Sequence, residues 1–357
     1  MDKIFFIILV IISTYIAHRA VKKDKKFFLF FLIFILSFIS GFRGEGVGVD
    51  TSEYYHAIIN NFPDSWMFRE IGFRFLSSSI YHTFGDPRYV FCIISFLTNS
   101  LVIMRLWDFR KKCDFSIMVF LYTLIYYFDT MNIMRQFLAV AILFYFSRIL
   151  EQKKYLLYLV IIFLCTLIHN TSPLALLILL IYYWDNLTNN QKIIIFLPLL
   201  GISILSICYL IIFQQGHIEN YFSINNIIYN INIPFLYRIG SALLGFFLFY
   251  SNIRIIVTQK PISSLTNSNF NRKEFKKIAI IYFIGLIFSS LGMFYFIMAR
   301  LGYFYLIFEL LFWGMLTYKS NPNRYLNLFI ILLFAIYTFA IELIFNGSGI
   351  FPFYFNL

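Results

Sequence analysis

A glycine-rich stretch from Gly41 to Tyr55 carries the first side chains that could bind a phosphate or move a proton. Arg43 offers a planar, permanently charged fork that suits phosphate oxygens, and the carboxylates of Glu45 and Asp50 follow within a few residues. The interspersed glycines allow positive φ and a close approach of the backbone to a ligand. Because the stretch follows a long apolar run and opens the longest polar segment, we interpret it as one wall of an active site.

Other polar residues recur where later apolar runs begin or end. They are Glu70, Arg135 with Gln136, His169 in the turn His169-Asn170-Thr171-Ser172-Pro173, Arg238 and Arg300. Arginine forks can neutralise a departing pyrophosphate without a metal, and a carboxylate or His169 could act as general base for an attacking hydroxyl. This chemistry favours a lipid-linked phosphate or pyrophosphate as the ligand.

Several of these residues also have simpler interpretations. Asp50 and Glu53 form a capping-box pattern for a short helix through Asn60, Glu70 and Arg74 have the spacing of a surface ion pair, and His169 could order its turn. Arg135 and Arg300 are harder to explain in this way, because a cation at a helix N-terminus opposes the helix dipole. Asp50, Glu53 and His56 could share a helix face, but we expect no metal site and no cofactor there.

The elements that must position these residues are membrane helices. The chain of 357 residues is 61% hydrophobic and 22% aromatic, with a mean hydropathy of +0.78. This composition predicts an all-α, polytopic membrane protein with one domain over 1–357. We expect about twelve spans, at roughly 4–18, 27–42, 88–106, 115–130, 133–149, 155–170, 173–184, 193–213, 236–257, 278–298, 301–317 and 325–345.

The distribution of the 29 Lys and Arg residues predicts the orientation. If the basic loop around 18–26 is cytoplasmic, most of these residues fall inside, as the positive-inside rule requires. The outer side then keeps Lys3, Arg43, Arg69, Arg74, Arg88, Arg135, Arg238 and Arg300. All but Lys3 are arginines, which favours bidentate binding of an anion over a topology signal. The net charge of +12 therefore indicates membrane topology and no nucleic-acid partner.

Two outer loops interrupt the spans, at 43–87 and 214–235. In the first, a helix is predicted to start at Asp50, and a second, interfacial helix to start at Pro63-Asp64-Ser65 and run from Trp66 to about His82. The four cysteines contain no CxxC pair, so neither a disulfide framework nor a zinc site is expected.

An ordered set of motifs resembles the EpsG family of Wzy-like polysaccharide polymerases. The motifs are Arg43-Gly44 with Val47-Gly48-Val49-Asp50-Thr51 and Tyr54, then Glu70-Ile71-Gly72, then Arg135-Gln136-Phe137-Leu138-Ala139, then His169-Asn170-Thr171-Ser172-Pro173-Leu174, with Arg300 a weaker match. The resemblance covers roughly residues 40–180, and beyond that it rests on hydropathy.

The resemblance implies a polymerase of the bacterial inner membrane with a fold like that of GT-C glycosyltransferases. It would join undecaprenyl-pyrophosphate-linked oligosaccharides, as donor and acceptor, into O-antigen or exopolysaccharide at the outer face. The expected partners are these lipid-linked units, membrane lipids and a chain-length regulator.

The site residues then take roles as a hypothesis. Arg43, Arg135 and Arg300 would bind pyrophosphate, Asp50, Glu70 or His169 would act as base or orient the substrate, and Glu45, Tyr54, Gln136 and Arg238 would contact sugars or the loop.

Two other classes of function stay open. A flippase or transporter of lipid-linked saccharide would need charges near the membrane midplane, whereas the charges here gather at one face. A membrane acyltransferase could use His169, but no other residue supports acyl-donor chemistry.

Overall fold

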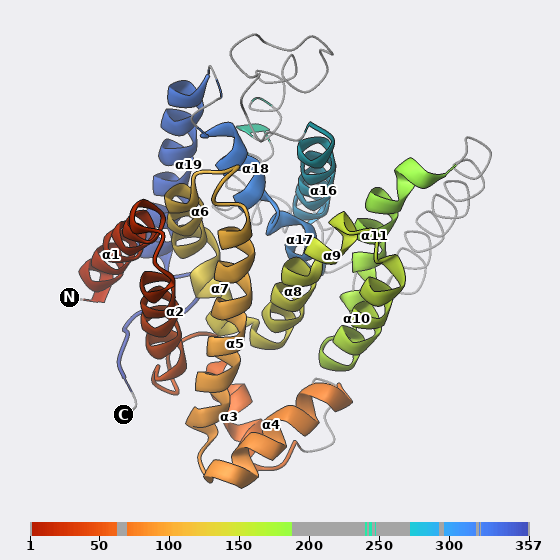
Figure 1. The fold of residues 1–357 in the computed structure, drawn as a ribbon. Coiled ribbons are helices and arrows are strands. Elements are labelled where there is room, and N and C mark those ends of the chain that lie inside the picture. The colour runs from red at the N-terminus through yellow and green to blue at the C-terminus, as the bar shows by residue number, and fades with distance from the viewer. Residues whose placement is uncertain are drawn as a thin grey trace, which may run out of the picture.

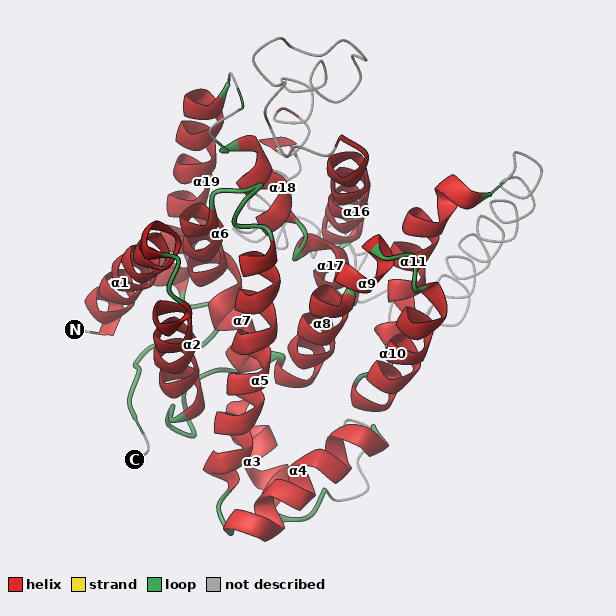
Figure 2. Cartoon of the chain, in the orientation of Figure 1, coloured by secondary structure: helices red, strands yellow, loops and turns green. Residues whose placement is uncertain are grey.

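The computed structural model describes residues 2–62, 70–187, 240, 243, 244, 247, 272–292, 296–318, 321 and 323–355. Among these residues helix is nearly the whole of the regular structure, as Figure 2 shows. The helices are α1 (Asp2–Lys23), α2 (Lys26–Gly41), α3 (Thr51–Ile59), α4 (Ile71–Phe84), α5 (Pro87–Asp108), α6 (Phe115–Leu121), η2 (Tyr122–Tyr126), α7 (Tyr127–Asn132), α8 (Met134–Phe146), α9 (Arg148–Glu151), α10 (Tyr155–Ile168), η3 (Ser172–Ala175), α11 (Leu176–Tyr183), η4 (Trp184–Asn186), α16 (Arg272–Leu291), α17 (Phe296–Leu306), α18 (Glu309–Leu316) and α19 (Arg324–Phe345).

The expected all-helical membrane architecture is confirmed, but the number of spans stays a prediction. By length and composition α1, α5 and α19 can each cross a membrane, and α17 with α18 can form a fourth, bent span with a 47° break. The predicted segments 193–213 and 236–257 lie almost wholly outside the described residues. Every other predicted segment overlaps a helix or consecutive helices, although residues 293–295 of the segment 278–298 also lie outside the described residues.

The bundle has two distinct ends (Figure 1). At one, which we name the α4 end, α3 and α4 lie beyond the ends of α2 and α8, and α5 runs down to meet them. At the other, the α9 end, ion pairs join turns that are far apart in sequence. Arg110 Nε lies 3.8 Å from Asp24 Oδ1, and Lys112 Nζ lies 2.7 Å from Glu274 Oε2. These turns are the ones that the sequence predicts to be cytoplasmic.

Local chemistry explains the hairpin of α4 and α5. Gly85 ends α4 with a φ of 73°, in the left-handed region that glycine adopts without strain. Asp86 then caps α5 by accepting a hydrogen bond from the Arg88 N–H at 2.8 Å, and Pro87 occupies the first turn, where no N–H is needed.

A separate hydrophobic cluster fixes α3 and α4 on the bundle. Its buried members come from α3, α4, α5 and α8 and include Tyr54, Phe73, Ile94 and Met134. The larger core lies between the other helices and the rest of α5 and α8. The α4 end therefore has its own small apolar base, on which the polar residues of the loop can be placed.

The structure refines the predicted outer loop. Helix α3 is confirmed, but the predicted cap is wrong, because the Asp50 side chain makes no capping hydrogen bond. Helix α4 begins at Ile71, whereas the predicted start at Pro63 lies outside the described residues, as do Arg69, the loop 214–235 and Arg238.

Candidate functional site

Arg135, in the first turn of α8, is the centre of a polar network at the α4 end. Its Nη1 donates to Glu70 Oε2 at 2.5 Å, and its Nε donates to the Tyr54 hydroxyl at 3.2 Å. The Nδ1 of His169 lies 3.5 Å from the other oxygen of Glu70. These contacts join four segments of the chain: Tyr54 is on α3, Glu70 precedes α4, Arg135 is on α8 and His169 follows α10. The carboxylate also offsets the unfavourable position of Arg135 at a helix N-terminus.

The charges of this network are nearly removed from water. The side chain of Glu70 is 7% exposed and that of Arg135 is 13% exposed. Burial raises the pKa of Glu70, but the contact with His169 and the charge of Arg135 outweigh it and hold the pKa below its ordinary value. Glu70 is therefore held as a carboxylate, and its expected partner, Arg74, donates instead to the Phe62 carbonyl at 3.2 Å.

A second pair lies beside this network and is more open. Arg300 Nη2, on α17, lies 3.9 Å from Asp50 Oδ2 at the start of α3. The Arg300 side chain is 40% exposed, about three times the fraction of Arg135. Gln136 connects the two groups, since its Nε2 donates to the Arg300 carbonyl at 2.5 Å. Neighbouring residues of α8 thus hold the Glu70 pair on one side and the Arg300 backbone on the other.

Asp50 differs from Glu70 in its electrostatics. Burial raises the pKa of Asp50 above its ordinary value, and the charges of Arg300 and Arg135 only partly oppose this effect. The two carboxylates at the α4 end are therefore unequal: Glu70 is held ionised, whereas Asp50 is easier to protonate. Such a separation is typical of sites in which carboxylates have different roles.

Arg43 does not join this cluster. Its side chain is buried, and its guanidinium donates to Thr51 Oγ1 at 3.1 Å, to the Met131 carbonyl at 2.8 Å and to the Ser40 carbonyl. Among the described residues, no carboxylate lies within ion-pair distance of Arg43. The hydrogen bonds of Arg43 attach the glycine-rich stretch to α2 and α7.

The C-terminal segment covers the glycine-rich stretch, which the sequence did not indicate. The N–H of Gly44 donates to the Tyr354 carbonyl and the N–H of Gly48 to the Gly349 carbonyl, both at 2.8 Å. Gly48 has a φ of 95°, and a Cβ there would lie 2.5 Å from Asn132 Oδ1. Glycines in this stretch are therefore required by close packing against the protein's own backbone and side chains. The approach of a ligand to this stretch stays a prediction.

Of the other predicted residues, Glu45 lies apart from the cluster, whereas Tyr54 belongs to the buried network around Arg135. Glu45 contacts His56 Nε2 at 3.2 Å and accepts a hydrogen bond from Ser52 at 3.4 Å, at the surface. Tyr54 is buried beneath Arg135 and is not placed to stack on a sugar. No group of three metal-ligating side chains is found in the part of the chain that the structure describes.

Two residues that the sequence analysis gave no role belong near the cluster. Tyr303 donates to Asp129 Oδ2 at 2.9 Å, and the charge of Arg300 reaches Asp129. Tyr303 is three residues after Arg300 on one helix, a spacing that places both on the same face and could have indicated it. Asp129 precedes the Arg135 motif by six positions but had no local signal of its own.

The family model of the EpsG family matches residues 26–355. The chain belongs to the EpsG family. No curated protein and no solved structure matches it. Membership of the EpsG family, together with the apolar helices, indicates a membrane protein of polysaccharide biosynthesis with a polymerase-like, glycosyltransferase type of activity.

Proposed function

We propose that this EpsG-family protein polymerises oligosaccharide units carried on undecaprenyl pyrophosphate, at the outer face of the bacterial inner membrane. The observation that carries the proposal is the partly exposed pair of Arg300 and Asp50 beside the buried pair of Arg135 and Glu70. Cations and carboxylates alternate over a short distance there, on elements fixed by the bundle. An arginine could therefore bind the departing pyrophosphate while a carboxylate takes the proton of the attacking hydroxyl in the same place.

Arg300 is the cation best placed to receive the pyrophosphate. Arg300 is more exposed than Arg135 and Arg43, the other two arginines predicted to bind pyrophosphate. The distance from its Nη2 to Asp50 Oδ2 is long at 3.9 Å. A guanidinium fork can donate hydrogen bonds to two phosphate oxygens at once, which stabilises the negative charge that develops on the leaving group. Arg135 and Arg43 are engaged inside the protein and would position the site without binding the leaving group.

Asp50 is the better candidate for the general base. The hydroxyl of the acceptor unit would attack the anomeric carbon of the donor, and its proton would pass to Asp50. The bond between that carbon and the pyrophosphate oxygen breaks, and the lipid pyrophosphate leaves with the bonding electrons. A carboxylate whose pKa is raised is a stronger base than Glu70, whose pKa is lowered.

The buried network of Glu70, Arg135, His169 and Tyr54 supports this site from beneath. It fixes α3, which carries Asp50 at its start, and α8, which holds the Arg300 backbone through Gln136. Loss of Arg135 would therefore reduce activity through misplacement of Asp50 and Arg300. An enzyme can lose a hundredfold in rate from a displacement of about 1 Å at such a site.

The proposal is tested with a saccharide ladder from cells that lack this gene, complemented with variants whose membrane insertion is checked. We expect polymer formation to fall by about 10²–10³-fold in Arg300→Ala, and Arg300→Lys to keep part of the activity because it keeps charge without the fork. Asp50→Asn should fall by about 10²–10⁴-fold. Arg88→Gln is the matched control, since Arg88 is an arginine near the same end and is paired with its neighbour Asp86.

The same cells distinguish the alternatives. Single repeat units that remain outside and transferable in the deletion strain support a polymerase, whereas units that accumulate inside support a flippase. A normal ladder in the deletion strain would refute both. Full activity in Arg300→Ala and Asp50→Asn, with the ladder lost on deletion, would leave a polymerase but refute this assignment of its residues.

A further inference from the structure

Two adjoining cavities lie at the α9 end, away from the site described above. One has a volume of about 560 Å³ and the other of about 510 Å³, and both are lined by Lys112 and Glu151. Their walls come from the end of α5 and the turn after it, from α9, from the start of α10, from the end of α11 and from the start of α16. Volumes of this size are typical of sites for small ligands.

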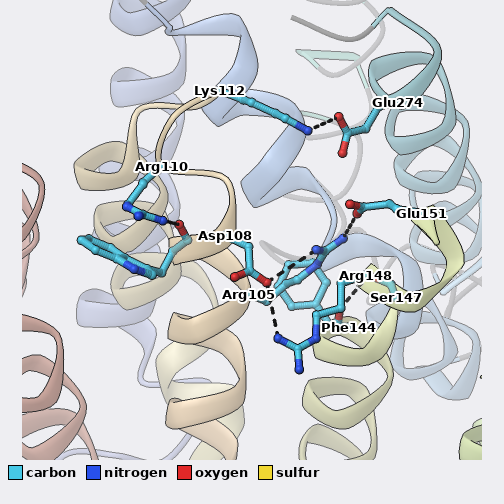
Figure 3. Close-up of polar contacts among 10 residues, drawn as sticks. Arg105, Asp108, Arg110, Lys112, Phe144, Ser147, Arg148, Glu151 and Glu274 are labelled. Atoms are coloured by element: carbon cyan, nitrogen blue, oxygen red, sulfur yellow. Dashed lines mark hydrogen bonds and ion pairs between the residues drawn. The ribbon is translucent and has the colours of Figure 1, made fainter. Parts of the chain in front are cut away.

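The charged lining of the cavities is mainly basic. The cations are Arg105, Lys112, Arg148, Lys153, Lys273 and Lys277, and the carboxylates are Asp108, Glu151 and Glu274. The carboxylates are engaged in pairs within the protein (Figure 3). Glu151 lies 2.5 Å from Arg105, and Glu274 lies 2.7 Å from Lys112. Cations outnumber carboxylates by two to one, so the cavities carry a positive field.

Two buried N–H or O–H donors in the lining have no hydrogen-bond partner among the described residues. One is the hydroxyl of Tyr182, a residue that is 3% exposed, and the other is Nε of Arg105, which is 1% exposed. A buried donor without a partner costs about 1–3 kcal/mol, so native proteins rarely leave one without a ligand or water. The backbone carbonyl of Tyr182 accepts from Lys277 Nζ at 3.3 Å, and this nitrogen lies 5.1 Å from the centroid of the Tyr182 ring, so the lysine is held beside the tyrosine.

We propose that these cavities bind a phosphate-bearing anion at the α9 end. A phosphate group presents several oxygens, and it can accept from the Tyr182 hydroxyl while lysines on α16 and in the turn after α9 surround it. Basic pockets between membrane helices on the cytoplasmic side are suited to anionic lipid head groups, and the turns here are those that the sequence predicts to be cytoplasmic. A soluble phosphate compound presents the same chemistry. This site is separate from the one at the α4 end and does not rest on the proposed polymerase function.

The test uses the purified full-length protein in detergent and measures its thermal unfolding midpoint, because a ligand of the folded state raises that midpoint with concentration. One series adds phosphatidylglycerol, with zwitterionic phosphatidylcholine as comparison. A second adds inorganic phosphate or pyrophosphate. The variants are Lys273→Gln with Lys277→Gln, and Tyr182→Phe, which keeps the ring. Lys22→Gln with Lys23→Gln is the matched control, since these lysines are in the last turn of α1 and do not line the cavities.

We expect at least one anionic probe to stabilise the wild type more than phosphatidylcholine does. The apparent dissociation constant should rise about fivefold for each lysine removed and roughly tenfold in Tyr182→Phe, and stay unchanged in the control pair. Stabilisation by phosphatidylglycerol alone identifies a lipid head group, and stabilisation by phosphate or pyrophosphate identifies a soluble compound. The proposal is overturned if no anionic probe stabilises the protein, or if the control pair weakens binding as much as the cavity variants do.

Discussion

The ion pair between Glu70 and Arg135 gives the sharpest test of how the α4 end is held together. In Glu70→Gln, Arg135 loses its carboxylate while its side chain stays 13% exposed in the structure. Removal of one partner of a buried pair typically costs 3–5 kcal/mol, because the other charge is left without compensation. Since the glutamine keeps an oxygen that can accept from Arg135, we expect the lower figure, about 3 kcal/mol.

This cost should appear as local opening of α3 and α4. A loss of about 3 kcal/mol corresponds to roughly a hundredfold increase in the population of the open state. Hydrogen exchange of the purified protein, followed by mass spectrometry of peptides from 51–59 and 71–84, measures that population. Peptides from α19 serve as an internal reference, because α19 packs mainly against η2 and α18.

A double-mutant cycle separates the pair from the burial of each residue. In Glu70→Gln combined with Arg135→Gln, neither charge is left alone, so the double variant should be less destabilised than the sum of the single variants by about 1–3 kcal/mol. Arg88→Gln, which removes an exposed ion pair at the same end, should leave exchange in α3 nearly unchanged. If the single changes are additive and exchange in Glu70→Gln rises less than threefold, the pair does not hold α3 and α4 to the bundle.

Three further predictions concern the same end of the molecule. Asp50 must be ionised to act as base, so polymerisation activity should fall at acidic pH, at a pH above that expected for an ordinary Asp. Arg300→Gln removes a charge that opposes the raised pKa of Asp50, so it should move this acidic fall in activity to still higher pH in a polymerisation assay. Glu70 has a lowered pKa in the folded state, so its contribution to stability is complete above the ordinary pKa of Glu and is lost as the pH falls through the lowered value. In a plot of the unfolding midpoint against pH, Glu70→Gln should therefore flatten the slope over this acidic range. Gly48→Ala should destabilise more than Gly85→Ala in thermal unfolding, because both glycines have positive φ but only at Gly48 would the new Cβ meet a side chain; equal losses would show that conformation alone matters.

The sequence by itself determined that the chain is helical and apolar and where most of its helices lie. Hydropathy and turn residues are local properties, so the runs that become α1, α2, α5 and α19 can be located without knowledge of their neighbours. The sequence also identified residues that belong together at one end, because Glu70, Arg135 and His169 each adjoin an apolar run that ends on that side.

Only the tertiary structure decided which of these residues are partners. Glu70 is four residues from Arg74, yet it pairs with Arg135, which is 65 residues away. The apolar cluster shared by α3, α4, α5 and α8 brings the start of α4 to that buried arginine, where a carboxylate must compensate its charge. The side chain of Asp50 faces Arg300 and makes no capping hydrogen bond to α3, because α17 places Arg300 next to the start of α3.

Only the tertiary structure also decided the partners of Arg43 and the packing of the C-terminal segment on the glycine-rich stretch. Their contacts span 88 residues to Met131 and 308 residues to Tyr354. The pattern of residues near Arg43 predicted an anion site, but a local pattern cannot distinguish a guanidinium that faces solvent from one that is enclosed by backbone carbonyls. That choice depends on which distant segments pack against it, and packing is decided by the free energy of the whole bundle.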